Sequence, residues 1–122
     1  SVKSHSIFKR SEENLYYELP ISIADAALGT TVEVPSIDGG KTKIKIPSGT
    51  QSGKQLRLRD KGMPILRRNT LGDLYIRIVT EVPTSLTKKQ KELLEEFKTL
   101  EDTKSNPLIK TFFDKAKKFW KN

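Results

Sequence analysis

The chain has 122 residues, of which 34% are hydrophobic and none is cysteine, and its formal net charge is +8. This length suits one domain with a thin core, and the lack of cysteine excludes disulfides and cysteine-ligated zinc within these residues. No apolar run approaches the roughly 20 residues of a membrane helix, and the first residues do not follow a signal-peptide pattern. Because the sequence does not begin with methionine, we expect a piece of a longer protein.

The charges are distributed unevenly along the chain. Residues 11–40 carry six acids and no Lys or Arg, whereas residues 41–68 carry nine Lys or Arg and one Asp. A basic block can attract nucleic acid, although lysines that alternate with isoleucine are more often the solvated face of a sheet. Binding of single strands also needs aromatic side chains to stack on bases, and residues 41–59 contain none. A basic nucleic-acid-binding β-module is therefore kept as the alternative function.

The first half of the chain predicts three short strands and one short helix. From Asn14 the residues alternate strictly, which is typical of a half-buried strand, and Pro20 marks that strand as an edge or a bulge because proline cannot donate to a ladder. Ser22 is expected to cap a helical turn over Ala24–Leu28 that Gly29 ends. Strands at Thr30–Pro35 and Lys41–Pro47 flank an Asp-Gly-Gly turn at residues 38–40.

The stretch Ile46–Met63 has two glycine corners around the alternating segment Gln55–Arg59, and we interpret it as a β-hairpin with one apolar and one basic face. Its segment 49–55 superficially resembles a phosphate-binding loop. That loop would need one more residue between its glycines, Ser or Thr in place of Gln55, and a following helix. We therefore prefer a structural loop to a nucleotide site. An irregular connection through Met63-Pro64 and Arg67-Arg68-Asn69 leads to a last strand over Asp73–Val82, ended by Pro83.

The pattern changes to helical after Pro83. Thr87 and Gln90 form a capping box, and the apolar residues of the following helix fall on one face. A polar linker over Glu101–Ser105 precedes Asn106-Pro107, which starts a second helix. We expect a mainly β protein: a small antiparallel β-sandwich of about five to six short strands with one short helix, followed by C-terminal helices.

The last helix carries an unusually large apolar stripe for so small a protein. Packing back on the sandwich, pairing with a second copy and binding to a membrane surface are all compatible with this stripe. We favour pairing with a second copy. The residues assigned to dimerisation are Leu108, Ile109, Phe112, Phe113, Ala116, Phe119 and Trp120.

No catalytic constellation is present in the sequence. His5 is the single histidine, and it has neither a cysteine nor a second histidine with which to share a metal. No nucleophile-elbow motif occurs, and the acids of the first long helix read as a solvated face that balances its lysines. We predict that the chain is not an enzyme and holds no cofactor or metal.

Several ordered motifs resemble the C-terminal substrate-binding region of bacterial DnaJ-type co-chaperones. They are Leu19-Pro-Ile-Ser-Ile, Ala26-Ala-Leu-Gly, Val34-Pro-Ser-Ile-Asp-Gly, Ile46-Pro-Ser-Gly-Thr-Gln-Ser-Gly, Leu58-Arg-Asp-Lys-Gly-Met, Gly72-Asp-Leu, Gln90-Lys-Glu-Leu-Leu and Phe112-Phe-Asp-Lys-Ala-Lys. The resemblance covers nearly the whole chain. One departure is Asp60, which stands where the family motif usually has glycine.

The resemblance implies three parts: a hinge and the end of a preceding β-subdomain in residues 1–12, a distal β-sandwich subdomain in residues 13–84, and a helical dimerisation segment in residues 85–122. The implied function is to bind unfolded polypeptide, to form a homodimer and, through the longer protein, to deliver clients to a DnaK-type ATPase in the cytoplasm. No membrane partner is implied. The chain lacks the J-domain motif and the cysteine repeats, so zinc is expected only in the cysteine-rich module of full-length relatives.

A half-solvated sandwich with a proline-bearing edge strand can accept an extended peptide as an added strand. By analogy with the groove of the family's first subdomain, we predict peptide binding between two rows of aliphatic residues. The rows are Leu19, Ile21 and Ile23 in one strand, and Val32 and Val34 in the next. Both rows could instead form ordinary core.

Overall fold

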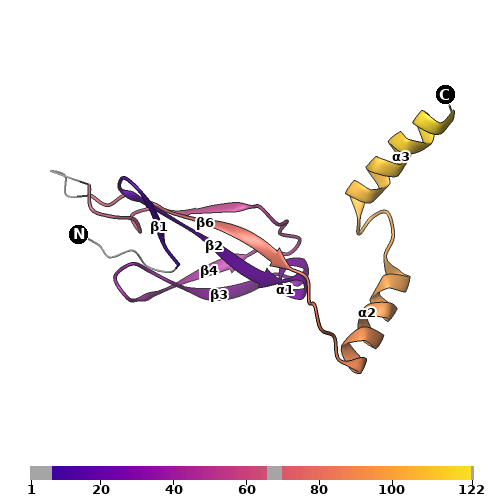
Figure 1. Ribbon diagram of the computed structural model, residues 1–122, viewed down its shortest axis with the longest axis horizontal. Coiled ribbons are helices and arrows are strands. Elements are labelled where there is room, and N and C mark those ends of the chain that lie inside the picture. Colours follow the sequence, from indigo (N-terminus) through magenta and orange to yellow (C-terminus); the bar gives the residue numbers. More distant parts are fainter. Residues whose placement is uncertain (1–6, 66–69, 122) are drawn as a thin grey trace. The chain divides into compact units, whose positions relative to one another are not determined.

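The computed structural model describes residues 7–65 and 70–121, and in these ranges the chain forms six strands and three helices (Figure 1). It divides into two compact units, residues 1–83 and residues 84–122. The predicted fold class, a mainly β sandwich followed by C-terminal helices, is confirmed. The predicted connection through Arg67-Arg68-Asn69 and residues 1–6 of the predicted hinge lie outside the described residues.

The first unit contains two sheets. One has four strands in the order β1-β2-β6-β5, and the other pairs β3 with β4. The bounds are β1 Lys9–Ser11, β2 Asn14–Ser22, α1 Ile23–Leu28, β3 Thr30–Pro35, β4 Lys41–Ile46, β5 Gln55–Leu58 and β6 Leu74–Glu81. Strand β1 was not predicted, because its three residues are all exposed and show no alternation.

The two sheets enclose one core, to which β2, β3, β4 and β6 all contribute. Alternating residues of β6 are almost completely buried, with Ile76 and Ile78 at 0% exposure. The other buried apolar residues are Leu15, Tyr17, Ile21, Ala26, Val34, Ile44, Ile46, Met63 and Leu74. The predicted alternation of β2 therefore holds up to Ile21, whereas Ile23 begins α1 rather than continuing the strand.

Strand direction differs from the prediction in one place. Strands β2 and β6 run parallel over eight residue pairs, from Leu15–Leu74 to Ser22–Glu81, so the four-stranded sheet is mixed rather than purely antiparallel. Parallel neighbours need a long connection between them, and here the connection is everything from α1 to β5. An alternating pattern gives the same signal for either direction, so the sequence could not distinguish them.

The stretch Ile46–Met63 is not the predicted hairpin, because β4 pairs with β3 whereas β5 pairs antiparallel with β6 in the other sheet. The intervening loop is a crossover between the two layers. Both Gly49 and Gly53 have positive φ angles, 78° and 95°, and the N–H of Gly49 donates to the carbonyl of Ala26 at 2.8 Å. The apolar sides of β4 and β5 face the core from opposite sheets, so the two strands share a core without pairing.

The local signals at α1 and at the β3–β4 turn are confirmed. The Ser22 hydroxyl accepts from the Asp25 N–H at 3.0 Å, and Gly29 ends the helix with φ 85°. At the turn, Gly39 has φ 92°, and an Asp38 carboxylate oxygen accepts from the Gly40 N–H at 2.8 Å. Gly29, which ends α1, and Gly39, in the β3–β4 turn, both have positive φ, and few residues other than glycine adopt that conformation.

Three segments of the first unit meet at the carbonyl of Glu13. This oxygen accepts from the Met63 N–H at 2.7 Å, while the Gly62 N–H donates to the Gly72 carbonyl at 2.9 Å. A Cβ atom at Gly62 would lie 2.5 Å from the Glu13 oxygen, and one at Gly72 would meet the same carbonyl still more closely. Both glycines are therefore required by the close approach of backbone to backbone.

The carboxylate of Asp73 fastens the start of β6 to the end of β5. Its oxygens accept from Arg57 Nε at 2.6 Å and from the backbone N–H of Asp60 at 3.1 Å. The Asp60 N–H and the Arg57 guanidinium both hold the pKa of Asp73 below its usual range. Asp60 itself has φ 62°, a left-handed conformation that favours glycine, which is the residue usual in the resembling motif, and that aspartate tolerates better than most.

Unit 2 contains α2, Lys88–Leu100, and α3, Pro107–Lys121. The predicted capping box at the start of α2 is confirmed, since the Thr87 hydroxyl accepts from the Gln90 N–H and the Gln90 side chain accepts from the Thr87 N–H. Neither helix contains a buried residue.

The first prediction concerns the meeting point at Glu13. Replacing Gly62 with alanine forces a methyl group into the Glu13 carbonyl, and we expect a loss of about 2 kcal/mol or more in the free energy of unfolding. Gly40→Ala is the matched control, because its Cβ would meet only the flexible side chains of Asp38 and Ser36. Urea unfolding of both variants measures the difference. Equal midpoints would contradict the steric argument.

The second prediction concerns acid. Because the folded-state pKa of Asp73 is lowered, its contribution to stability is present above the unfolded value of about 3.9 and is lost as the pH falls through the lower folded value. Asp73→Asn should therefore be less stable than the wild type at neutral pH, with the gap narrowing below about pH 4. Urea midpoints across this range provide the measurement, with Glu81→Gln at the end of β6 as the control. A gap independent of pH would refute the linkage.

Candidate functional site

The residues of the predicted peptide groove lie in two different layers. Ile21 of β2 and Val34 of β3 are members of the core, while Leu19 and Val32 are partly buried against it. Ile23, at the start of α1, is also partly exposed. The two rows thus face a shared interior, and the side chains of Ile21 and Val34 cannot reach a ligand without opening that interior.

Tyr17 links the same two layers. Its hydroxyl donates to the Pro35 carbonyl at 3.2 Å, and its ring meets Phe8 edge-on with the ring centroids 5.2 Å apart. Burial raises the pKa of Tyr17 to about 12, so this hydroxyl stays protonated and keeps its bond to the carbonyl at physiological pH. The space between β2 and β3 is therefore closed here by a tyrosine and a hydrogen bond.

The backbone edge of β2 is more accessible than its side-chain rows. Strand β1 pairs only with Asn14–Tyr16, so within the described part of the chain Tyr17–Ser22 has a strand neighbour on the β6 side alone. The Leu15 N–H points to β6, because it donates to the Asp73 carbonyl at 2.9 Å. Directions alternate along a strand, so Glu18, Pro20 and Ser22 turn their backbone groups to the open side. Pro20 lies where the sequence predicts an edge, with its missing N–H facing outward.

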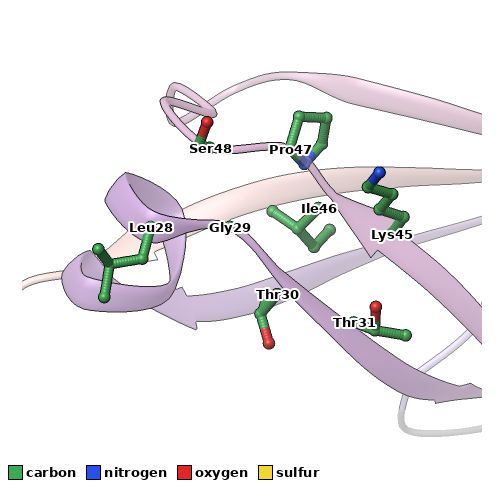
Figure 2. A pocket seen from close by; sticks show the side chains of 8 residues that line it. All are labelled: Leu28, Gly29, Thr30, Thr31, Lys45, Ile46, Pro47 and Ser48. Carbon is green, nitrogen blue, oxygen red and sulfur yellow. The ribbon is translucent and has the colours of Figure 1, made fainter.

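A hollow of about 430 Å³ lies where α1, β3 and β4 come together (Figure 2). Beside it the crossover loop lies close against the end of α1, since a Cβ at Gly29 would lie 2.9 Å from the Ser48 nitrogen. Leu28 on its rim is 80% exposed. The lining residues are Leu28, Gly29, Thr30, Thr31, Lys45, Ile46, Pro47 and Ser48. An aliphatic rim with hydroxyls and one amine can hold an apolar side chain, but it offers no nucleophile beside a base.

The outer face of the four-stranded sheet carries a ladder that the sequence reasoning missed. Tyr16 and Tyr75 are register partners whose rings stack with the centroids 5.1 Å apart, and the Arg57 guanidinium lies 6.0 Å from the Tyr75 ring. These aromatics are in β2 and β6, outside residues 41–59. The sequence signal for this pair was that both tyrosines occupy outward-facing positions of alternating strands. Such cross-strand pairs stabilise a sheet.

Charge on this face is largely balanced within the chain. Arg57 is paired with Asp73 at 2.6 Å, and Arg77 lies 4.0 Å from Glu18. The stacked tyrosines therefore lie beside guanidinium groups that already have acidic partners. This arrangement does not strengthen the alternative of a nucleic-acid surface.

The residues assigned to dimerisation are brought together along one face of α3. Their spacing of three and four residues places them on one stripe, and Phe112 and Trp120 are 65% and 71% exposed. Phe112 and Phe113 meet edge-on with the centroids 5.0 Å apart. Ala116 alone among the seven is partly buried. Among residues 84–121 of unit 2, no side chain covers the stripe.

Residues 7–65 and 70–121 offer neither a metal site nor a membrane-spanning helix. They contain no group of three or more His, Cys, Asp or Glu side chains that could hold a metal ion. No helix in these ranges has both the length and the apolar content needed to cross a membrane.

Comparison with known proteins gives the same result across the two units. A family model described as the DnaJ C terminal domain matches residues 1–83, and one described as the Chaperone protein DnaJ C-terminal region matches residues 89–122. Proteins named Chaperone protein DnaJ from Pelagibacter ubique and Azorhizobium caulinodans are 66% and 53% identical over 100% and 98% of this chain. That from Ruegeria pomeroyi is 50% identical over 98%. The chain spans about a third of the length of these relatives, 31–32%. It therefore belongs to the DnaJ C-terminal domain family, as a C-terminal part of a DnaJ chaperone.

Proposed function

We propose that this chain is the non-enzymatic part of a DnaJ-type co-chaperone that binds unfolded polypeptide and self-associates. The whole protein would act in the cytoplasm and pass its clients to a DnaK-type ATPase. A cysteine-free chain suits such a reducing compartment. The observation that carries the proposal is the continuous similarity to Chaperone protein DnaJ along all 122 residues, together with two surfaces that no described residue covers.

The first surface is the open edge of β2. An extended chain can add here as a further strand, with the Glu18 N–H and the carbonyls of Glu18 and Pro20 as its partners. Main-chain bonds of this kind are independent of the client's side chains, so the preference for sequence would be weak. Leu19, Ile23 and Val32 are partly buried rather than enclosed, and they would supply aliphatic contact where the core residues Ile21 and Val34 cannot.

The second surface is the apolar stripe of α3. Helices of 13 and 15 residues are marginally stable in water unless their apolar face is packed. Seven residues of one stripe are available in α3, and burial of each large side chain contributes about 1.5–3 kcal/mol. A second copy is the partner we assign to this stripe.

The third prediction tests the client edge. A labelled chain titrated with an extended apolar peptide should show the largest amide shift changes at Glu18 and Ser22, whose N–H groups face outward. The edge of β5, Gln55–Leu58, is the internal control. Glu18→Pro removes one outward donor without touching the ladder to β6, and it should weaken the peptide's affinity at least about threefold. If the amides of β2 do not move, or if Glu18→Pro binds as the wild type does, this edge is not the client site.

The fourth prediction tests self-association. Phe112→Ala and Trp120→Ala each remove a large side chain from the stripe, and we expect each to raise the dissociation constant of the dimer at least about tenfold. Lys118→Ala, on the opposite face of α3, should leave it unchanged within about twofold. Sedimentation velocity over a concentration series is the measurement. A wild-type chain that stays monomeric at high concentration would contradict the proposal.

A further inference from the structure

Unit 2 presents two apolar stripes, one on α2 and one on α3. Either stripe of a second copy has the apolar side chains needed to cover the α3 stripe. The stripe of α2 consists of Leu93, Leu94, Phe97 and Leu100, all exposed. The stripe of α3 is the seven-residue set defined above. In a dimer each chain contributes both stripes, so α3 can pack on the α3 or on the α2 of a second copy.

The linker between the helices is folded while both stripes remain open. An Asp102 carboxylate oxygen accepts from the Lys104 and Ser105 N–H groups at 2.9 and 3.0 Å. The Asn106 amide donates to the Glu101 carboxylate at 3.0 Å, so local hydrogen bonds occupy the linker from end to end. With the linker in this conformation the helices of one chain do not cover each other, since neither contains a buried residue.

The edges of the α3 stripe are basic on both sides. Lys115 follows Phe112 by three residues and precedes Phe119 by four, which places it beside one edge. Lys117 follows Phe113 by four residues and precedes Trp120 by three, which places it beside the other edge. The single acid of the helix, Asp114, is bonded to Lys110 at 2.6 Å and lies away from the stripe.

The edges of the α2 stripe differ from each other. Glu96 lies between Leu93 and Leu100 at the same spacing of three and four residues, and Lys89 lies on that edge two turns earlier, four residues before Leu93. The opposite edge carries Lys91 and Lys98, beside Leu94. Glu95 is on the far side of the helix. Within the described part of unit 2, Glu96 is thus the acid that stands directly beside an apolar stripe, on an edge whose start carries Lys89.

Charge complementarity then selects the pairing. Two α3 helices placed face to face would bring lysine against lysine along their borders. An α3 helix on an α2 helix can instead bring one lysine border against Glu96. We propose that the α3 stripe of one copy packs on the α2 stripe of a second copy, and reciprocally, so that one two-fold contact covers all four stripes. This inference rests on the proposed self-association.

The fifth prediction uses a matched pair of charge reversals. Glu96→Lys places a lysine against the basic border of the partner's α3 at both symmetric contacts, and we expect it to raise the dimer dissociation constant roughly tenfold. Glu95→Lys makes the same change of charge one residue away, and it should have little effect. Circular dichroism establishes that both variants keep their helix content, and sedimentation equilibrium measures the dissociation constants.

A complementary mixture tests whether the contact lies between chains. Glu96→Lys chains are mixed with Lys115→Glu chains and, separately, with Lys117→Glu chains. One of the two mixtures should form a heterodimer at least about fivefold tighter than the Glu96→Lys homodimer, because each reversed charge then meets its opposite. The lysine that rescues identifies the border facing Glu96. Added salt should weaken the wild-type dimer.

The outcomes separate the two proposals. A monomeric wild type overturns the proposed self-association and this pairing with it. A wild-type dimer that is indifferent to Glu96→Lys and tightens with salt retains self-association but overturns the pairing in favour of α3 against α3. If Glu96→Lys raises the dimer dissociation constant and neither mixture restores it, the contact of Glu96 lies within one chain. That result also overturns the pairing. Weakening reversed by one mixture supports it.

Discussion

The carbonyl of Glu13 is the constraint on which the first unit depends. It accepts from the Met63 N–H, and two glycines, Gly62 and Gly72, approach it so closely that no side chain fits. This contact fixes the start of β2 beside the start of β6, which then run parallel for eight residue pairs. With β6 on one side and a three-residue β1 on the other, the far half of β2 has an open edge among residues 7–65 and 70–121. The proposed client site thus lies on the side of β2 opposite the strand that the glycine junction holds.

The small size of the sandwich limits where binding can occur. Six short strands and one core leave few apolar side chains uncommitted, and a groove lined by Ile21 and Val34 would have to be taken from that core. Burying such side chains is what stabilises so small a unit. Backbone edges and the exposed rim of the hollow at Leu28 are not part of the core. A ligand can therefore bind there with little loss of stability.

The second unit follows a different physical rule. Helix α2 has a capping box and both helices have clear amphipathic stripes, but neither contains a buried residue, so most of their stabilisation must come from contacts made outside a single unit. Self-association would also serve client binding. Two copies held together present two β2 edges, and an unfolded chain that engages one edge meets the second at a raised effective concentration.

The sequence by itself determined the features that depend only on residues a few positions apart. They are the alternation in β2, the caps at Ser22 and Thr87, the turn at Asp38-Gly39-Gly40 and the stripe of α3. The family followed from ordered motifs. Only the tertiary structure decided that Ile46–Met63 crosses between sheets, that β2 and β6 run parallel, and that Ile21 and Val34 lie in the core. A period of two records which side chains turn inward, but it contains no information on the direction or identity of the neighbouring strand.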